Sequence, residues 1–302
     1  MKLELGKKVK AALKQGRPVV ALETSVLAQG LAWPRNLEAA KRCEEAIRRV
    51  GAVPAAVAVF EGKIHVGLSD PQTVALCKPG GHLLKLGARD LAPAIARKAS
   101  GGTTVSATCE IAAAAGIKVF ATGGIGGVHR GVLEQFDISS DLTAISRSPV
   151  AVVCAGAKTV LDLPRTLEAL ETLSVPVVGY KTDALPGFYI RSTGLPLEHR
   201  VDDPKTAAKM LQVRFDVLKQ GGVVIAVPPP AKSALQRADV ERHLRAAMAI
   251  GKARRVWGKA VTPFLLGELA RRTKGQSVIA NLDLLENNAA VAAEIAVELA
   301  KA

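Results

Sequence analysis

The residue with the most distinctive chemical setting in this chain is Lys158. It follows an apolar run over residues 151–157 that predicts a buried parallel strand, and the stretch from residue 159 predicts a helix. A cation is disfavoured at the positive end of a helix dipole, which favours the uncharged amine. A lysine amine in that state can attack a sugar carbon. The residues alone equally allow a surface lysine whose stem packs on the rim of the sheet.

Two more polar residues follow apolar segments. Glu23 comes after the predicted strand 17–22 and before the polar loop 24–30. The carboxyl ends of parallel strands are where α/β proteins hold ligands, so Glu23 could act there as an acid. Asn281 could orient a base or a sugar through its amide. A solvated loop glutamate and an asparagine that caps the next helix explain the same residues.

A glycine-rich loop at residues 123–131 follows the predicted strand 117–122. Glycines at this density let backbone N–H groups approach an anion. The presence of His129 and Arg130 favours a ligand loop over a simple tight turn. The loop is not the dinucleotide-binding fingerprint, because His129 occupies the third glycine position.

An acidic, hydroxyl-rich segment follows at residues 136–142. Asp137 could coordinate a hard cation within a shell of oxygen ligands. Ser139 and Ser140 could donate hydrogen bonds to a phosphate or a sugar, although an ordinary helix cap is an equally good interpretation. Lys85 could pair with a phosphate, and a solvated lysine explains it as well.

Strand-like and helix-like segments alternate along almost the whole chain. This alternation predicts an α/β fold, and the absence of a linker or a break in composition predicts a single domain over residues 1–302. The predicted strands are 17–22, 53–60, 64–68, 117–122, 150–155, 175–180 and 222–227, and the predicted helices are 34–51, 103–115, 159–173, 204–219, 263–272 and 287–300.

Composition narrows the class of protein. Of 302 residues, 49% are hydrophobic and only 3% aromatic, so the core must consist of small and branched aliphatic side chains, as in a parallel sheet covered by helices. The 4 cysteines form no CxxC pair, which argues against zinc and disulfides and predicts a cytoplasmic protein. The early charges of the N-terminus predict no signal peptide, and no apolar run is long enough to span a membrane. The net charge of +14 suits a phosphorylated small molecule, whereas a basic RNA-binding module is the weaker alternative because no RNA-reading motif is present.

Taken together, these segments resemble the pseudouridine-5'-phosphate glycosidase family, also called indigoidine synthase A-like. The resemblance runs over residues 17–296 and is most specific at 121–131, 136–139, 155–158, 280–281 and 287–289. It implies a single α/β/α layered domain with a largely parallel central sheet, and a homotrimer. It also implies reversible cleavage of the C–C glycosidic bond of pseudouridine 5'-phosphate to uracil and ribose 5-phosphate, an activity also named pseudouridylate synthase.

The resemblance assigns roles to residues of this chain. Lys158 matches the nucleophile that bonds to C1', and Glu23 matches the proton donor. Asp137 matches the ligand of one divalent metal per subunit, usually Mn²⁺, held largely through water. Substrate-binding positions are Lys85, Val105, Ser139, Ser140, Asp141 and Asn281, with His129 in a supporting role. Neither a nucleic acid nor a membrane is implied as a partner.

Three departures from the family pattern bear on substrate preference. Gln29 stands where the family commonly has histidine, Gly87 and Ala88 replace a serine and an arginine, and Lys181 replaces a small or neutral residue. The lysine, glutamate and aspartate remain in place. A Schiff-base lyase or aldolase that acts on another sugar phosphate would use such a lysine too, and it is the alternative enzyme class.

Overall fold

A computed structural model describes residues 3–132, 136–256, 258 and 261–301, and its strands form one 11-stranded sheet. The strands are β1 (Glu4–Leu5), β2 (Val19–Leu22), β3 (Val53–Phe60), β4 (Lys63–Val66), β5 (Leu84–Leu86), β6 (Gly101–Thr103), β7 (Val119–Ala121), β8 (Ala151–Cys154), β9 (Val177–Tyr180), β10 (His199–Val201) and β11 (Val223–Ala226). Their order is β1-β4-β3-β2-β7-β8-β11-β9-β10, and β6 pairs with β3 and β5 beside this path.

Helices connect and cover the strands. They are α1 (Lys7–Lys14), α2 (Arg35–Arg49), α3 (Asp70–Cys77), α4 (Ala88–Ala96), α5 (Val105–Ala114), α7 (Ser140–Arg147), α8 (Leu163–Thr172), α9 (Pro204–Gln212), α10 (Arg237–Ala253), α11 (Val261–Arg272) and α12 (Gln276–Ala300). Two short π-helical segments are η1 (Val26–Gly30) and η2 (Val213–Val217). Among the helices in the described ranges, none is both long and apolar enough to span a membrane.

The central strands run parallel because helical crossovers join them. From β3 through β2, β7, β8, β11 and β9 to β10, every neighbouring pair is parallel, whereas β4 and β6 run antiparallel to β3. β2, β8 and β11 are buried along their entire length, as expected for strands covered on both faces. The predicted parallel sheet is therefore confirmed.

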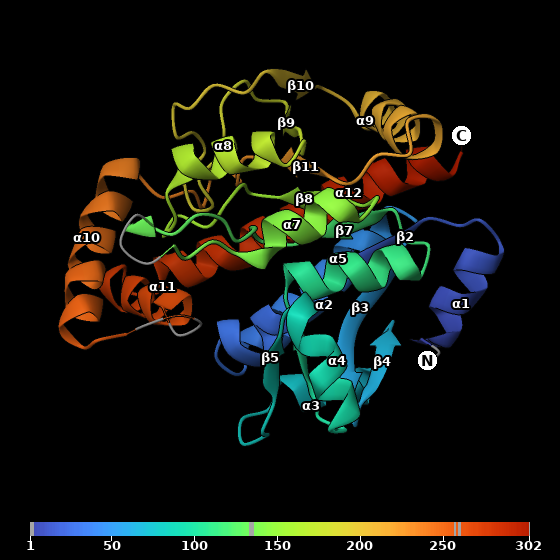
Figure 1. Cartoon of the computed structure of the whole chain (residues 1–302), viewed down its shortest axis with the longest axis horizontal. Coiled ribbons are helices and arrows are strands. Elements are labelled where there is room, and N and C mark those ends of the chain that lie inside the picture. Colours follow the sequence, from blue (N-terminus) through green and yellow to red (C-terminus); the bar gives the residue numbers. More distant parts are fainter. Residues whose placement is uncertain (1–2, 133–135, 257, 259–260, 302) are drawn as a thin grey trace.

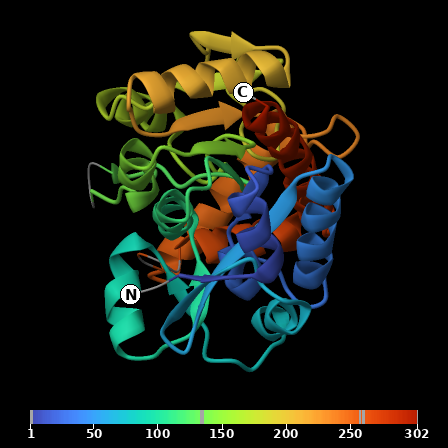
Figure 2. The same cartoon turned by 90° about the vertical axis from the view of Figure 1, so that its right-hand side faces the viewer.

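The two faces of the sheet belong to two separate cores. Val20 and Leu22 of β2 pack in the core that contains α2, α9 and α12, whereas Val19 and Ala21 pack in the core that contains α5, α7 and α8. This alternation is the period-2 geometry of a strand. The helical layers lie on opposite sides of the sheet, with the long α12 crossing the middle of the molecule (Figures 1 and 2). The α/β/α layering is confirmed.

Local structure differs from the sequence-based expectation at two informative places. The helix predicted from residue 159 begins only at Leu163, where Asp162 caps it by accepting the Arg165 N–H at 3.2 Å. Lys158 is thus separated from the helix, and the helix-dipole argument for it is wrong. The helix predicted from residue 287 begins at Gln276. Asn281 consequently lies inside α12 rather than capping it, so the capping interpretation is also wrong.

Candidate active site

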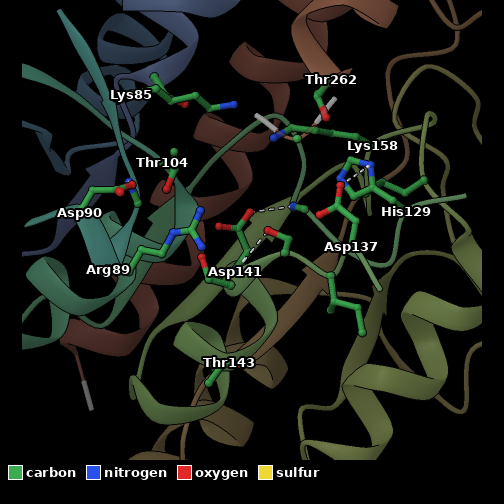
Figure 3. A pocket seen from close by; sticks show the side chains of 18 residues that line it. Lys85, Arg89, Asp90, Thr104, His129, Asp137, Asp141, Thr143, Lys158 and Thr262 are labelled. Atoms are coloured by element: carbon green, nitrogen blue, oxygen red, sulfur yellow. Dashed lines mark hydrogen bonds and ion pairs between the residues drawn. The ribbon is translucent and has the colours of Figure 1, made fainter. Parts of the chain in front are cut away.

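A cleft of about 410 Å³ lies among the segments that follow β2, β7 and β8. Lys85 and Arg89 enter it from one side, and Lys158, His129 and Asp137 from the opposite side (Figure 3). This space is called the outer cleft here. Its lining includes Ser25, Lys85, Arg89, Asp90, Thr104, His129, Asp137, Ser139, Ser140, Asp141, Lys158 and Thr262.

A smaller space of about 60 Å³ adjoins the outer cleft and is called the inner hollow. Ser25, Lys85, Lys158 and Thr262 line both spaces, so the two spaces lie side by side. The other residues that line the inner hollow include Glu23, Gln29, Gly123, Gly124, Phe188, Leu266, Asn281 and Leu285. The structure therefore brings together the residues predicted as nucleophile, proton donor and base contact, although they are far apart in the sequence.

Glu23 is held in a fixed orientation at the inner hollow. Its side chain belongs to a residue that is only 8% exposed. One carboxylate oxygen accepts a hydrogen bond from the Ser25 hydroxyl at 2.5 Å, and the other accepts one from the Thr122 hydroxyl. Thr122 directly follows β7. Two neighbouring strand ends thus position this carboxylate.

Lys158 is positioned by a sharp turn at the end of β8. Gly156 adopts a φ of +82°, and a Cβ there would collide with the Pro186 carbonyl oxygen. The turn is then fixed by the Lys158 N–H, which donates to the Ile125 carbonyl at 3.1 Å, and by the Lys158 carbonyl, which accepts the Leu161 N–H at 3.0 Å. Only glycine tolerates this path, which carries the lysine side chain to both spaces.

Asp141 and Asp137 have different parts in the outer cleft. Both Asp141 carboxylate oxygens accept backbone hydrogen bonds, from Ser106 at 2.9 Å and from Gly126 at 2.8 Å, which fastens α5 and the glycine loop to α7. The Asp137 side chain is 37% exposed and faces His129 Nδ1 at 3.7 Å. Asp141 is therefore mainly a structural anchor in the wall of the cleft, whereas Asp137 presents its carboxylate to the cleft.

The outer cleft carries charges of both signs, with Lys85, Arg89 and Lys158 matched in number by Asp90, Asp137 and Asp141. Burial lowers the pKa of His129, the Asp137 carboxylate opposes this shift, and the Lys158 and Lys85 ammonium groups lower the pKa further. Lys85 and Lys158 act on this imidazole from opposite walls, and together with Arg89 they offer cationic partners to an anion.

The glycine loop lines both spaces, but four of its N–H groups are used within the protein. The N–H groups of Ile125, Gly126, Val128 and His129 donate to the Gly156 carbonyl, Asp141, Thr166 and the Asp137 carbonyl, so these four are not directed at a ligand. Glycine is required for close packing instead. A Cβ on Gly126 would collide with the Ser139 hydroxyl and lie 2.7 Å from Asp141 Oδ2.

Of three other residues predicted to bind substrate, two line the outer cleft and one is buried in the core. Val105 is not among the described residues that line either space, because its side chain is buried in the core at the start of α5. Ser139 lines the outer cleft and is also the N-cap of α7, where its hydroxyl accepts the Asp141 N–H at 3.2 Å. Ser140 lines the cleft, and its hydroxyl donates to Ser106 at 3.4 Å.

Several lining residues carry no signal in the sequence. Thr104 is an N-cap residue, and Thr262 lies in α11, with no motif around either.

Asn288, in a segment that the family resemblance singles out, is fully buried and donates to the Thr122 carbonyl at 2.8 Å. It fastens α12 to the residue that holds Glu23. Only knowledge of which segments meet in space reveals these contacts.

The donor set around Asp137 is small for a metal. Within the described ranges, no group of three or more His, Cys, Asp and Glu residues gathers in a way that could hold an ion. Asp137, with His129 beside it and hydroxyls in the same wall, offers one carboxylate to a hard cation. These residues fit an ion that keeps most of its shell as water, and they do not fit a site built from protein ligands alone.

The chain is similar to known proteins over almost its whole length. Residues 8–298 match the model of the family described as indigoidine synthase A like protein. A pseudouridine-5'-phosphate glycosidase of Myxococcus xanthus is 58% identical over 302 residues and covers 100% of both chains. Another of that name, from Herpetosiphon aurantiacus, is 50% identical over 298 residues and covers 99% of this chain and 98% of its own.

Two solved structures share the fold. The prealnumycin C-glycosynthase AlnA, solved in complex with ribulose 5-phosphate, superimposes with a TM-score of 0.91 at 39% identity and covers 99% of this chain and 97% of its own. An indigoidine synthase A-like protein from Thermotoga maritima has a TM-score of 0.88 at 34% identity and covers 99% and 96% of the two chains. The likeness therefore extends over the whole layered sheet and its helices.

Proposed function

Because this chain belongs to the family of indigoidine synthase A-like proteins, we propose that it cleaves pseudouridine 5'-phosphate reversibly to uracil and ribose 5-phosphate. The observation that carries the proposal is the inner hollow. It places Glu23, Lys158 and Asn281 around one space that adjoins the outer cleft, whose wall carries Lys85 and Arg89. Such a site offers an acid, an amine and an amide to a sugar-bound base, and cations to a phosphate.

A lysine suits this substrate because the bond to be broken joins two carbon atoms. Protonating a leaving oxygen, as ordinary glycosidases do, cannot break it. We propose that the Lys158 amine bonds to C1' as the C1'–O4' bond breaks, and that Glu23 gives its proton to O4'. The lysine nitrogen then releases one proton. The base takes up one proton at C5 when the C1'–C5 bond breaks, so the two transfers balance.

The carbon–carbon bond then breaks without a further reagent. The lone pair of the lysine nitrogen forms a C=N bond to C1' as the C1'–C5 pair of electrons returns to the base, which leaves as neutral uracil. Water hydrolyses the imine to ribose 5-phosphate and restores the amine. Ser25 and Thr122 hold the Glu23 carboxylate in place for both proton transfers.

The outer cleft supplies binding. Lys85 and Arg89 in one wall offer charge-assisted hydrogen bonds to a phosphate, and Ser139 and Ser140 in the other offer hydroxyls. Substrate contact at Val105 would have to come from its backbone, since its side chain is buried. His129 and Asp141 keep supporting roles, the latter through its two backbone hydrogen bonds.

We also propose one Mn²⁺ per subunit at Asp137. Bound there largely through water, the ion would neutralise anionic charge and order water beside the phosphate. Asp137 and His129 are the residues of this chain that would hold it. Their part is to fix the position of the hydrated ion in the wall of the outer cleft.

The proposed function also includes an oligomeric state and a location in the cell. We propose a homotrimer, and the exposed apolar side chains of Val213, Val217 and Leu218 are a surface that association would cover. We propose a cytoplasmic location because Cys43, Cys77, Cys109 and Cys154 are all free and buried, as in proteins of reducing compartments.

The test is incubation of the purified protein with pseudouridine 5'-phosphate and Mn²⁺, with chromatography of free uracil and ribose 5-phosphate. Lys158→Ala is expected to lower turnover by at least about 10³-fold, as removal of a nucleophile does, and to leave the thermal midpoint nearly unchanged. Borohydride is expected to trap ribose 5-phosphate on the wild-type lysine and not on Lys158→Ala. Normal turnover by Lys158→Ala would refute the covalent role. Absence of uracil, with cleavage of another sugar phosphate, would establish the lyase or aldolase alternative instead.

A further inference from the structure

We propose that Gln29 determines base specificity by accepting a hydrogen bond from an N–H group of the base, an inference that rests on the proposed function. Gln29 lines the inner hollow beside Lys158 and Glu23. Its Oε1 atom is buried, and it has no hydrogen-bond partner within the described part of the chain. A buried acceptor without a donor is costly, so a donor supplied by the bound molecule accounts for its presence.

The orientation of the Gln29 amide is fixed by its other end. Its Nε2 donates to the Leu83 carbonyl at 3.1 Å. Because a carbonyl can only accept, the nitrogen must face Leu83, and Oε1 must be the atom left without a partner. The amide therefore cannot turn to present a donor without losing the bond to Leu83.

The backbone that carries Gln29 is also unusual. Residues 26–30 form the π-helical segment η1, in which the Leu31 N–H reaches back to the Val26 carbonyl at 2.9 Å. The buried Asn36 side chain donates to the Leu27 carbonyl at 2.8 Å and holds this segment from behind. Single π turns of this kind commonly occur at functional sites, where the extra residue redirects a side chain. Here it places Gln29 in the wall of the hollow.

Asn281, which also lines the hollow, provides a second acceptor, and two acceptors select for a base with two donors. Asn281 is only 6% exposed, and its Oδ1 likewise has no partner among the described residues. The residues that line the hollow thus include two amides whose buried oxygens have no partner among the described residues, with Phe188, Leu266 and Leu285 as apolar neighbours. A uracil ring joined to the sugar through C5 carries two N–H donors, at N1 and N3. A uracil joined through N1 carries only one.

Two acceptors for two donors give a physical basis for choosing the carbon-linked base. With an N1-linked nucleotide, one of the amide oxygens would stay buried without a donor, which is the situation that sites discriminate against most strongly. Gln29 contributes one of the two acceptors, and Asn281 contributes the other. We therefore assign to Gln29 the selection of one N–H of the base.

The experiment measures binding rather than turnover. Dissociation constants of uracil, 1-methyluracil and 3-methyluracil are determined by calorimetry without any sugar phosphate, so that no glycosidic bond can form, for the wild type, for Gln29→Met and for Gln15→Met as an exposed control. Gln29→Met is expected to weaken uracil binding about tenfold. Methylation of the nitrogen that Gln29 contacts should weaken binding to the wild type by at least as much, and binding to Gln29→Met much less.

Other results overturn the inference in distinguishable ways. If uracil binds the wild type but each methyl group costs the same with and without Gln29, Gln29 does not contact the base, and the proposed function stands. If the affinity for ribose 5-phosphate alone falls in Gln29→Met, the side chain acts through Leu83 and the neighbouring Lys85, and its role is structural. If the wild type neither binds uracil nor releases it from pseudouridine 5'-phosphate, both proposals fail.

Discussion

The inner hollow and the outer cleft share Ser25, Lys85, Lys158 and Thr262 but differ in size and in the rest of their lining. The hollow measures about 60 Å³, and Glu23 and Asn281 in its wall are almost completely buried. The cleft measures about 410 Å³, and Arg89 and Asp137 are in its wall alone. The small, largely apolar space suits recognition of a base beside the lysine, whereas the larger space with more charged groups suits a phosphate. Substitutions in the hollow should therefore act mainly on kcat or on base choice, and those in the cleft on KM.

The largest effect after loss of the lysine is expected in the hollow from Glu23→Gln. The amide keeps the shape of the side chain but cannot give a proton to the ring oxygen, so kcat should fall about 10²- to 10⁴-fold with little change in KM. Steady-state rates of uracil release measure both constants. Glu110→Gln, on the exposed side of α5, is the matched control. A variant whose KM rises while kcat holds would show that Glu23 only binds substrate.

A change in the cleft should give the opposite pattern. Arg89→Met removes a guanidinium from the wall that faces the phosphate, so KM for pseudouridine 5'-phosphate should rise about 10- to 100-fold with a much smaller change in kcat. Arg97→Met, at the exposed end of α4, should leave both constants unchanged. The affinity for ribose 5-phosphate should fall in parallel. If kcat falls instead, the division of labour between the two spaces is wrong.

Asn288→Ala tests the hydrogen bond that fastens α12 to the end of β7. The substitution should lower the stability of the protein. It removes the hydrogen bond of a fully buried side chain to the Thr122 carbonyl, so the free energy of unfolding should fall by about 1–3 kcal/mol. Denaturation by urea measures it. Asn287→Ala is the neighbouring control, since its amide reaches the Pro228 carbonyl only at 3.5 Å. If both variants lose the same free energy of unfolding, the hydrogen bond to Thr122 contributes no more to stability than the long contact of Asn287.

The smallest effect is expected from thiol reagents. Burial raises the pKa of Cys43 and Cys154 to about 12 and that of Cys77 to about 11, and it also raises the pKa of Cys109. Raised pKa values lower the thiolate fraction at neutral pH, so reaction should be slow in the folded protein and rise only toward alkaline pH or on unfolding. Titration with a chromogenic disulfide measures this. A fast-reacting thiol whose modification stops turnover would make cysteine, and not only Lys158, part of the chemistry.

The sequence predicted β2, β3, β4, β7, β8, β9 and β11, because most of them are short apolar runs with turn residues beside them, but it missed the short strands β1, β5, β6 and β10. It also located Lys158 and Glu23 after strands, which is where they lie. The helix after Lys158 was misplaced because residues 158–161 form a turn that pairs with the glycine loop through His129 and Leu161. Local patterns cannot reveal a partner about thirty residues away.

The role of the glycines shows the same limit. A dense glycine loop predicted backbone groups free for an anion, but Gly126 is glycine because Ser139 and Asp141 pack against it. Its N–H is used by Asp141. The reason for a glycine at that position lies in a helix that follows it in the chain, and only the three-dimensional arrangement shows it. The sequence likewise could not predict that the buried Gln29 Oε1 atom has no donor among the described residues.

The placement of α12 sets when this protein can begin to work. This last helix supplies Asn281 to the hollow, and Asn288 fastens it to the end of β7. Chains emerge from the ribosome with their N-terminal part first, so Glu23 and Lys158 are synthesised long before the helix that completes their surroundings. A chain in which α12 has not yet packed against β7 therefore has Glu23 and Lys158 but lacks the wall of the hollow that contains Asn281. Under the proposed function, activity requires this last packing step.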